Sequence, residues 1–325
     1  MSRKSVCVVI VNYNAGAMLA ECVRSVLAST VPVEVFVSDN GSQDDSIAFL
    51  RAALGAPVPV TVIENRENLG FAKGCNVVLP RCRSEYVLFL NPDCVVEPDT
   101  LGEMIRVMDA RPDAGMASCL VLNPDGTEQA GCRRFVPTPW RSMVRVLHLH
   151  RAIKHHPRFR SFMMTGLPLP PEPEPVEAIS GAFMFVRSAA IKAVGAMDER
   201  YFLHCEDLDW CMRFRAAGWK ILFVPNVRIT HWKGTSGRTH PARVEYHKHR
   251  GMIRFYNKFF RHQYPGLLMV AVVAAVCVRF VLKASWVTLR RMPGGTRAGR
   301  PAGRELPPAR QAPATHGSAS GQPRR

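Results

Sequence analysis

Several signatures of common enzyme classes are absent from this sequence of 325 residues. Its ten cysteines form no C-x-x-C pair, which argues against zinc ribbons and thioredoxin-like sites. The turn after the first expected strand lacks G-x-G-x-x-G, which disfavours an NAD enzyme, and the lack of G-x-x-x-x-G-K-[ST] excludes a P-loop NTPase. The apolar run at residues 6–11 is too short for a signal-peptide core, so we interpret it as the first strand.

Acidic residues are also scarce, with 26 Asp and Glu against 43 Lys and Arg, for a net charge of +17. Such a balance indicates an anionic partner: nucleotide phosphates, an acidic membrane surface or nucleic acid. Residues 290–325 contain eight Arg and one Glu among Gly, Pro, Ala and Ser, and we expect a disordered basic tail there. We do not expect a nucleic-acid partner, because charge alone supports only non-specific binding.

The placement of four cysteines gives an expectation about redox compartment. They fall in apolar stretches, where a thiol behaves as a small hydrophobic group; the four are Cys7, Cys75, Cys94 and Cys119. We therefore expect a reducing compartment.

Residues 1–125 alternate apolar strands with helical patterns. Strands are predicted at residues 5–11, 33–37, 58–63 and 86–90, and helices at 17–28, 45–54 and 71–79. A helix at 100–110 and a strand at 117–122 follow. Strands that alternate with helices form βαβ units with a parallel sheet, so the predicted fold class is α/β with a Rossmann-like nucleotide-binding half.

The strand at residues 86–90 should stop at Pro92, because proline cannot donate to a sheet ladder. Asn91 and Asp93 would then emerge at the carboxyl end of the strand, where open α/β sheets bind ligands. Their oxygens suit a hard divalent cation that also holds phosphates. The alternative is an ordinary Asn-Pro-Asp turn.

Two further stretches have nucleotide-binding chemistry. Asp39 ends the second strand, a position that commonly receives a ribose hydroxyl or a base N–H, although a simple strand-end turn explains it equally well. Gly70, Lys73 and Gly74 surround a helix start, which can present amides and a charge to phosphates. Ordinary helix capping is the alternative there.

A basic segment from residue 133 to 160 contains no carboxylate. Within it, Trp140, Met143, Val144 and Leu147 share one helical face, a pattern typical of a helix that lies in a membrane interface. A helix packed on the domain with a solvated basic face is the alternative. We treat residues 133–175 as an insertion that ends in a proline-rich connector at 168–175.

A strand is expected at residues 178–186, and a helix from Glu206 to a stop at Gly218. Asp207 would head its apolar face, a place where a carboxylate could act as a general base; a cap that favours the helix dipole is the alternative. Asp209 and Arg213 are expected to form a structural i,i+4 ion pair.

Two short strands at residues 221–224 and 227–230 lead to His231, which is a candidate ligand of a metal or phosphate, or else a structural histidine. Residues 267–278 are apolar, and Arg279 and Lys283 follow them. An interfacial or re-entrant helix is favoured slightly over a true membrane span, and a buried packing helix comes third.

Together these stretches resemble glycosyltransferase family 2, the inverting GT-A enzymes, and are most similar to bacterial rhamnosyltransferase-like members. The resemblance spans roughly residues 5 to 240. Seven motifs in the family's order support it, at residues 9–14, 39–42, 67–72, 90–93, 180–183, 206–211 and 231–236.

The resemblance implies a role for each matching residue. Asp207 would be the catalytic base, and Asp93 and His231 would hold Mg²⁺ or Mn²⁺. The nucleotide sugar would bind at Asn12, Asp39, Asn40, Gly70, Lys73 and Asn91, and the acceptor near Gly181, Glu206 and Trp210. Asn91 stands where the family's D-x-D has its first acid, which removes one charge from the metal site and puts the metal requirement in doubt.

The implied activity is transfer of a sugar with inversion, with rhamnose from dTDP-rhamnose as the expected donor. The acceptor would be a lipid-linked or cell-envelope polysaccharide at the cytoplasmic face of the cell membrane. A degenerate membrane-associated adaptor on the same fold, or a transferase with another nucleotide sugar, is the alternative. The expected divisions are a donor half (1–125), an acceptor half (126–240), membrane-associated helices (241–289) and the basic tail (290–325).

Overall fold

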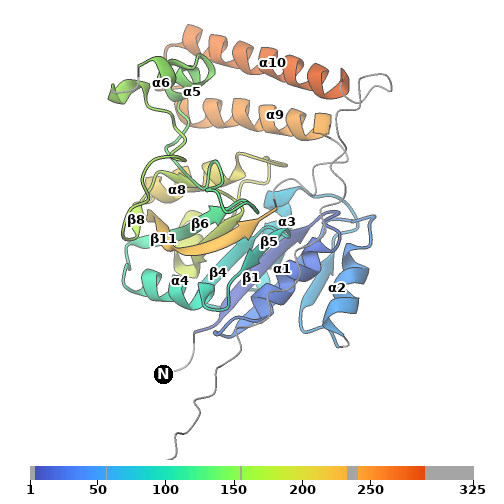
Figure 1. The fold of residues 1–325 in the computed structure, drawn as a ribbon. Helices are drawn as coiled ribbons and strands as arrows, with labels where there is room; N and C mark the ends of the chain where they lie inside the picture. Colours follow the sequence, from blue (N-terminus) through green and yellow to red (C-terminus); the bar gives the residue numbers. More distant parts are fainter. Residues whose placement is uncertain (1–3, 56, 154–155, 233–240, 290–325) are drawn as a thin grey trace, which may run out of the picture.

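A computed structural model describes residues 4–55, 57–153, 156–232 and 241–289. Within them, one nine-stranded sheet is covered by helices, and a pair of long helices lies at one end of the molecule (Figure 1). The sheet order is β3-β2-β1-β4-β10-β6-β11-β5, with β8 paired to β11. The predicted tail at 290–325 lies outside the described residues.

The first 122 residues contain the predicted alternation of strands and helices. The strands are β1 (Val6–Asn12), β2 (Val33–Asp39), β3 (Thr61–Glu64), β4 (Tyr86–Leu90), β5 (Cys94–Val96) and β6 (Ala114–Leu122). The helices are α1 (Met18–Leu27), α2 (Ser46–Leu54), α3 (Phe71–Val78), the 3₁₀ turn η1 (Leu79–Arg81) and α4 (Thr100–Asp109). The prediction of β4 is confirmed at both ends, whereas β3 begins three residues late because Pro59 has no N–H for the ladder.

The described residues after Leu122 form short strands and helices first and two long helices at the end. The short elements are β7 (Arg133–Arg134), α5 (Pro139–Val146), α6 (Leu149–Ala152), η2 (Pro157–Phe159), β8 (Glu174–Pro175), β9 (Ala178–Ile179) and β10 (Phe183–Arg187). After them come α7 (Ser188–Val194), α8 (Glu206–Ala216), β11 (Lys220–His231), α9 (Pro241–Phe260) and α10 (Gly266–Leu289).

Two strand predictions in this second part are wrong. The strand expected at 178–186 is split into β9 and β10, because Gly181 between them donates its N–H to Asp207 and not to a ladder. The two short strands expected at 221–224 and 227–230 are a single strand, β11, whose register against β6 shifts between Val224 and Arg228.

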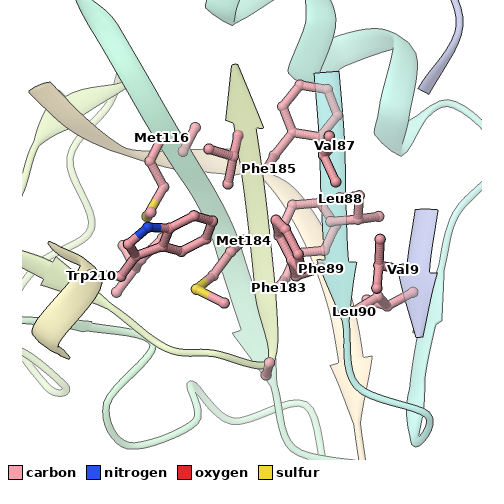
Figure 2. Packing of buried hydrophobic residues seen from close by; sticks show 14 of the residues in the cluster. Val9, Val87, Leu88, Phe89, Leu90, Met116, Phe183, Met184, Phe185 and Trp210 are labelled. Carbon is pink, nitrogen blue, oxygen red and sulfur yellow. The ribbon is translucent and has the colours of Figure 1, made fainter. Parts of the chain in front are cut away.

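The sheet is mixed and its core is continuous. Strands β3, β2, β1 and β4 are parallel, β10 runs antiparallel between β4 and β6, and β6 is parallel to β11. All seven residues of β1 are buried, as expected for a strand with helices on both faces. Phe89 of β4 meets Trp210 of α8 edge to face, with ring centroids 5.3 Å apart (Figure 2).

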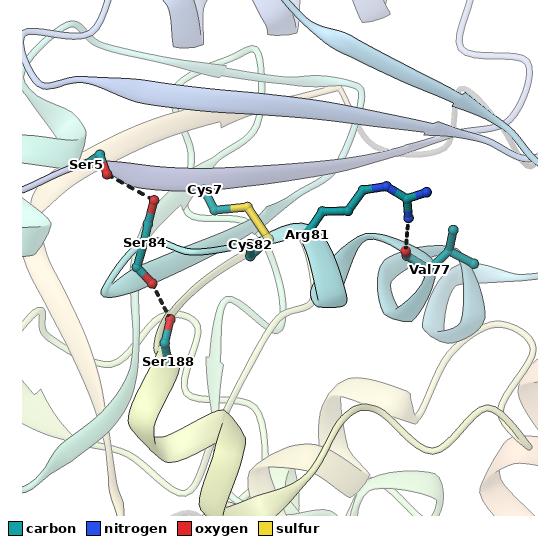
Figure 3. The surroundings of a disulfide bond; sticks show 7 residues. All are labelled: Ser5, Cys7, Val77, Arg81, Cys82, Ser84 and Ser188. Carbon is teal, nitrogen blue, oxygen red and sulfur yellow. Dashed lines mark hydrogen bonds between the residues drawn. A yellow bond between two sulfur atoms is a disulfide. The ribbon is translucent and has the colours of Figure 1, made fainter.

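One expectation about cysteine is wrong. Cys7 of β1 is not a free apolar thiol but forms a disulfide with Cys82, which follows η1 (Figure 3). The other eight cysteines are free, and seven of them are buried.

The basic segment at 133–160 is less available to a membrane than its composition indicates. The Arg133 side chain is 1% exposed and pairs with Glu128, while Arg141 pairs with Glu177. The carboxylates that the segment lacks are supplied from outside it. Helix α5 has eight residues, and its predicted apolar face is divided, since Val144 is buried but Leu147 is 59% exposed.

The C-terminal helices α9 and α10 pack side by side (Figure 1). By length and composition, Gly266–Trp286 could cross a membrane: its mean hydropathy is 2.4 and only 11% of the most apolar window is buried. Leu267 is 84% exposed and Val270 65%. The third alternative, a buried packing helix, is therefore wrong for α10.

Candidate active site

Polar side chains gather where β1 and β2 end. Asn12 and Asp39 are partners in the parallel register, and Asn12 Nδ2 donates to Asp39 Oδ1 over 2.7 Å. Ser42 donates to the same carboxylate through its hydroxyl (2.6 Å) and its backbone N–H (3.1 Å). Both Asn12 and Asp39 are buried, so their orientation is fixed by the chain itself.

Gly70 connects this region to the second half of the chain. Its φ is +80°, and a Cβ there would lie 2.3 Å from the carbonyl oxygen of Phe202, so only glycine fits. Phe71 donates its backbone N–H to that same oxygen, and Asn40 Nδ2 donates to the Gly70 carbonyl. Lys73, one turn into α3, is exposed.

The predicted metal ligands lie together although they are distant in sequence. In the antiparallel pairing of β11 with β5, His231 lies opposite Cys94. His231 Nε2 is 3.0 Å from Asp93 Oδ1 and 3.3 Å from Asn91 Nδ2. Ligand atoms of Asp93, Cys94 and His231 all lie within 4.8 Å of one another.

This donor set suits a divalent cation at Asp93 and His231. A carboxylate oxygen and an imidazole nitrogen that point at the same place are common metal ligands. Cys94 is less suited, because burial and the Asp93 charge raise the pKa of its thiol well above 9.0, and its Sγ donates to the Ala182 carbonyl.

Asp207, the predicted base, lies at the start of α8. Its Oδ2 accepts from Arg134 Nη2 and from the Gly181 N–H (3.2 Å), while its Oδ1 accepts from the Leu208 N–H (2.8 Å). Arg134 also donates to the carbonyl of Ile179. The carboxylate is therefore held by three donors, and the Asp207 side chain keeps 14% of its surface exposed.

The backbone before Asp207 has an unusual conformation. His204 and Cys205 have φ values of +67° and +69°, which non-glycine residues rarely adopt. Gly251 of α9 packs on this bend, and a Cβ at Gly251 would lie 2.9 Å from the His204 carbonyl oxygen. Thus α9 approaches the loop that carries Asp207 without a side chain between them.

Glu206 is a buried acid next to Asp207. Burial and the Asp207 charge raise the pKa of Glu206 from 4.5 to about 8. Its Oε2 has no hydrogen-bond partner among the described residues. Burial therefore favours the protonated form of the Glu206 side chain.

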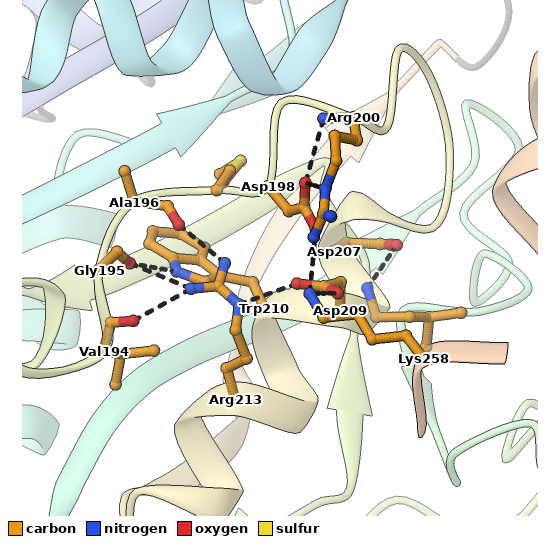
Figure 4. A network of polar contacts seen from close by, with 12 residues as sticks. Val194, Gly195, Ala196, Asp198, Arg200, Asp207, Asp209, Trp210, Arg213 and Lys258 are labelled. Atoms are coloured by element: carbon orange, nitrogen blue, oxygen red, sulfur yellow. Dashed lines mark hydrogen bonds and ion pairs between the residues drawn. The ribbon is translucent and has the colours of Figure 1, made fainter. Parts of the chain in front are cut away.

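Two neighbours of Asp207 are structural (Figure 4). Asp209 Oδ1 accepts from Arg213 Nε over 2.8 Å, so the predicted ion pair is confirmed, and Asp209 also meets Lys258 of α9. Trp210 is fully buried and its indole N–H donates to the Gly195 carbonyl. Because the Trp210 side chain lies in the core, the structure gives it no acceptor-facing surface.

Sequence reasoning did not identify two residues that contact the site. Arg134 belongs to the basic segment expected at a membrane surface, but the two-residue ladder of β7 with β9 brings it to Asp207. Gln129, which follows the turn after β6, bonds to the His231 ring. Neither has a motif signal, since both contacts depend on pairings remote in sequence.

The family model described as "Glycosyl transferase family 2" matches residues 7–169. An N-acetylglucosaminyl-diphospho-decaprenol L-rhamnosyltransferase of Mycobacterium tuberculosis is 29% identical over 247 residues, covering 72% of this chain and 78% of that protein. The rhamnosyltransferase WbbL of Escherichia coli is 26% identical over 165 residues, covering 48% of this chain and 55% of its own length.

Among solved structures, the mannosyltransferase PcManGT from Pyrobaculum calidifontis, in complex with GDP-Man and Mn²⁺, is similar with a TM-score of 0.55. The match covers 91% of this chain and 77% of that one at 16% identity, which supports a shared GT-A fold.

Proposed function

Because this chain belongs to glycosyl transferase family 2, we propose that it transfers rhamnose with inversion from dTDP-rhamnose to a lipid-linked or cell-envelope polysaccharide acceptor. The observation that carries the proposal is a pair of carboxylates with different partners. Asp93 meets the imidazole of His231, whereas Asp207 meets the guanidinium of Arg134. The first pairing suits a cation, and the second suits a base held in place.

On the donor side, Asp93 and His231 would hold Mg²⁺ or Mn²⁺, and the ion would supply positive charge for a departing nucleoside diphosphate. Asn91 would contribute a neutral amide beside them. Residues at the ends of β1 and β2 and the start of α3 would bind the nucleotide: Asn12, Asp39, Asn40, Gly70 and Lys73. The fixed orientation of Asn12 and Asp39 supports this, because preorganised groups lose little entropy on binding.

On the acceptor side, Asp207 would remove the proton from the attacking hydroxyl. Inversion needs only one displacement, so one base is enough, as in inverting glycosidases. Arg134 and the Gly181 N–H would orient the carboxylate. Protonated Glu206 would not compete for the acceptor proton, since its pKa is raised to about 8.

The sugar and acceptor classes are taken from the relatives. The M. tuberculosis relative is named as a rhamnosyltransferase for a diphospho-decaprenol-linked acceptor, at 29% identity. We extend this to the present chain as a proposal, with the polysaccharide of a cell envelope as the end product.

A lipid-linked acceptor would require the enzyme at a membrane, and the exposed apolar surface of α10 supports membrane association, which we propose is at the cytoplasmic face. Changing the exposed Val270 to Asp is expected to reduce flotation with anionic phospholipid vesicles, because it places a charge on the apolar surface of α10. Phe49→Asp, at a 46% exposed apolar residue of α2, is the matched control. Equal flotation of the Val270 variant and the unaltered protein would contradict this role of α10.

The activity is tested by incubating the full chain with a panel of nucleotide sugars and a polyprenyl-diphosphate acceptor. Transfer from dTDP-rhamnose, with the anomeric configuration of the product inverted by NMR, is the expected result. Transfer from a different donor would correct the sugar, and no transfer, hydrolysis or binding with any donor would reject the function.

The second candidate, a degenerate adaptor, is favoured by Asn91 at the position of the first D-x-D acid. Calorimetry with dTDP-sugars, with and without Mn²⁺, separates the two. An adaptor should show no metal-dependent binding.

A further inference from the structure

Gln129 lies behind the proposed metal ligand His231, on the far side of the imidazole ring from Asp93. We propose that Gln129 is a positioning residue that fixes His231 in the tautomer with hydrogen on Nδ1, so that Nε2 is the nitrogen available to a divalent cation. This inference rests on the metal site of the proposed function. Gln129 is only 4% exposed, and its backbone N–H donates to the carbonyl of Val121 on β6.

The orientation of the Gln129 amide follows from its two acceptors. Its Nε2 donates to Asn123 Oδ1 over 3.0 Å and to the His231 carbonyl over 3.3 Å. Asn123 is itself oriented, because its Nδ2 donates to Thr127 Oγ1. The remaining atom of the amide, Gln129 Oε1, therefore faces His231 Nδ1 at 2.7 Å.

An amide oxygen can only accept, so His231 Nδ1 must carry a hydrogen. In a neutral imidazole the other nitrogen, Nε2, then has a lone pair and no hydrogen. That lone pair points to the place where Asp93 Oδ1 lies 3.0 Å away, and Asn91 Nδ2 lies 3.3 Å away. A cation between carboxylate and imidazole would be attracted to both.

The backbone alone does not determine this orientation. The register of β11 with β5 and the bond from the Trp232 N–H to the Asp93 carbonyl bring the two segments together. They place the His231 backbone but do not determine which ring nitrogen carries the hydrogen. Gln129 supplies the restraint, in the way that second partners of ligating histidines usually fix tautomer and ring angle.

A merely structural role for Gln129 would be to satisfy a buried histidine nitrogen. It would predict lower stability on substitution, without a change in tautomer or in metal affinity. The two interpretations therefore differ in quantities that need neither a nucleotide sugar nor catalytic activity.

The test uses the full chain, metal-free and with ¹⁵N-labelled histidine, at a pH where imidazoles are neutral. The ring ¹⁵N shifts report the tautomer, and comparison with His231→Gln assigns the signals among the eleven histidines. The unaltered protein is expected to show hydrogen on Nδ1. Hydrogen on Nε2 would overturn the proposal without any variant of Gln129.

Gln129→Met keeps the side-chain size and removes the amide acceptor. It is expected to give mixed tautomers and to weaken binding of Mn²⁺ alone, titrated by electron paramagnetic resonance, by about 10- to 100-fold. Gln263→Met, the same substitution at an exposed glutamine after α9 whose amide bonds to the Phe259 carbonyl, is the matched control and should change neither. A Gln129→Met protein with one tautomer and Mn²⁺ affinity within about twofold of the control would also overturn it. Because neither readout uses a donor sugar, failure of rhamnosyl transfer leaves this result independent.

Discussion

Asp93 and Asp207 are both largely buried carboxylates, and each meets a nitrogen-containing side chain from a distant part of the sequence. Asp93 meets His231, whose imidazole nitrogen would offer a cation a lone pair beside the carboxylate. Asp207 meets Arg134, which stays protonated and has no lone pair to offer. The comparison teaches that the partner, more than the acid, distinguishes the proposed metal ligand Asp93 from the proposed base Asp207.

The strongest way to sharpen this comparison is to remove the charge of Asp207. Asp207→Asn should lower kcat by about 10²–10⁴-fold, the usual contribution of a general base, while Mn²⁺ affinity stays unchanged. Steady-state transfer assays and Mn²⁺ titration measure the two effects. Asp99→Asn, an exposed acid before α4, is the control. Undiminished turnover in Asp207→Asn would reject the base assignment.

Removing the guanidinium tests the other side of the same pair. Arg134→Leu should lower the free energy of unfolding by about 3 kcal/mol, because it leaves the mostly buried Asp207 carboxylate without its partner. Urea denaturation measures the change. Arg106→Leu breaks the exposed pair with Glu103 and should lower the free energy of unfolding far less, because solvent screens exposed ion pairs. Similar losses in the two variants would mean that the Arg134 pair acts like a surface pair.

The same Asp-to-Asn change at Asp93 tests the proposed metal ligand. Asp93→Asn should weaken Mn²⁺ binding by at least about 10-fold, since a neutral amide replaces a charged ligand. Isothermal titration with MnCl₂ measures this affinity. Equal losses of Mn²⁺ affinity in Asp93→Asn and Asp207→Asn would contradict the distinction between the two carboxylates.

Glu206, next to Asp207, makes the stability of the fold depend on pH. The pKa of Glu206 is raised in the folded state, so between pH about 5 and 8 the folded protein binds a proton that the unfolded chain has released. Glu206 therefore makes the free energy of unfolding fall as pH rises through this range. Glu206→Gln should remove that part of the slope in urea titrations at pH 5, 6.5 and 8. An unchanged pH dependence of stability in Glu206→Gln would mean that another group causes it.

The order of the elements in the first half was predictable because its signals are local. The run at Tyr86–Leu90 is wholly apolar and ends at a proline, so both ends of β4 followed from composition. The family resemblance implied that Asp93 and His231 belong to one site. In the structure His231 Nε2 lies 3.0 Å from Asp93 Oδ1.

Other features had no local signal. Arg134 reaches Asp207 through a ladder of two residues, and Cys82 reaches Cys7 through the parallel pairing of β1 with β4. The composition of the basic segment at 133–160 predicted a membrane-facing helix, but Arg133 and Arg141 pair with carboxylates outside the segment. Such contacts depend on which strands pair, and the residues next to each position in the sequence do not reveal that pairing.

The interleaved strand order has a consequence for how the chain can be divided. Strand β6 precedes residue 125, but both of its neighbours, β10 and β11, come later in the sequence. A polypeptide that stopped at residue 125 would expose both edges of an apolar strand and is expected to aggregate. When it is co-expressed with residues 126–325, the fragment 1–125 is expected to become soluble, because β10 and β11 then pair with β6. The protein is therefore a candidate for complementation between two separately translated fragments.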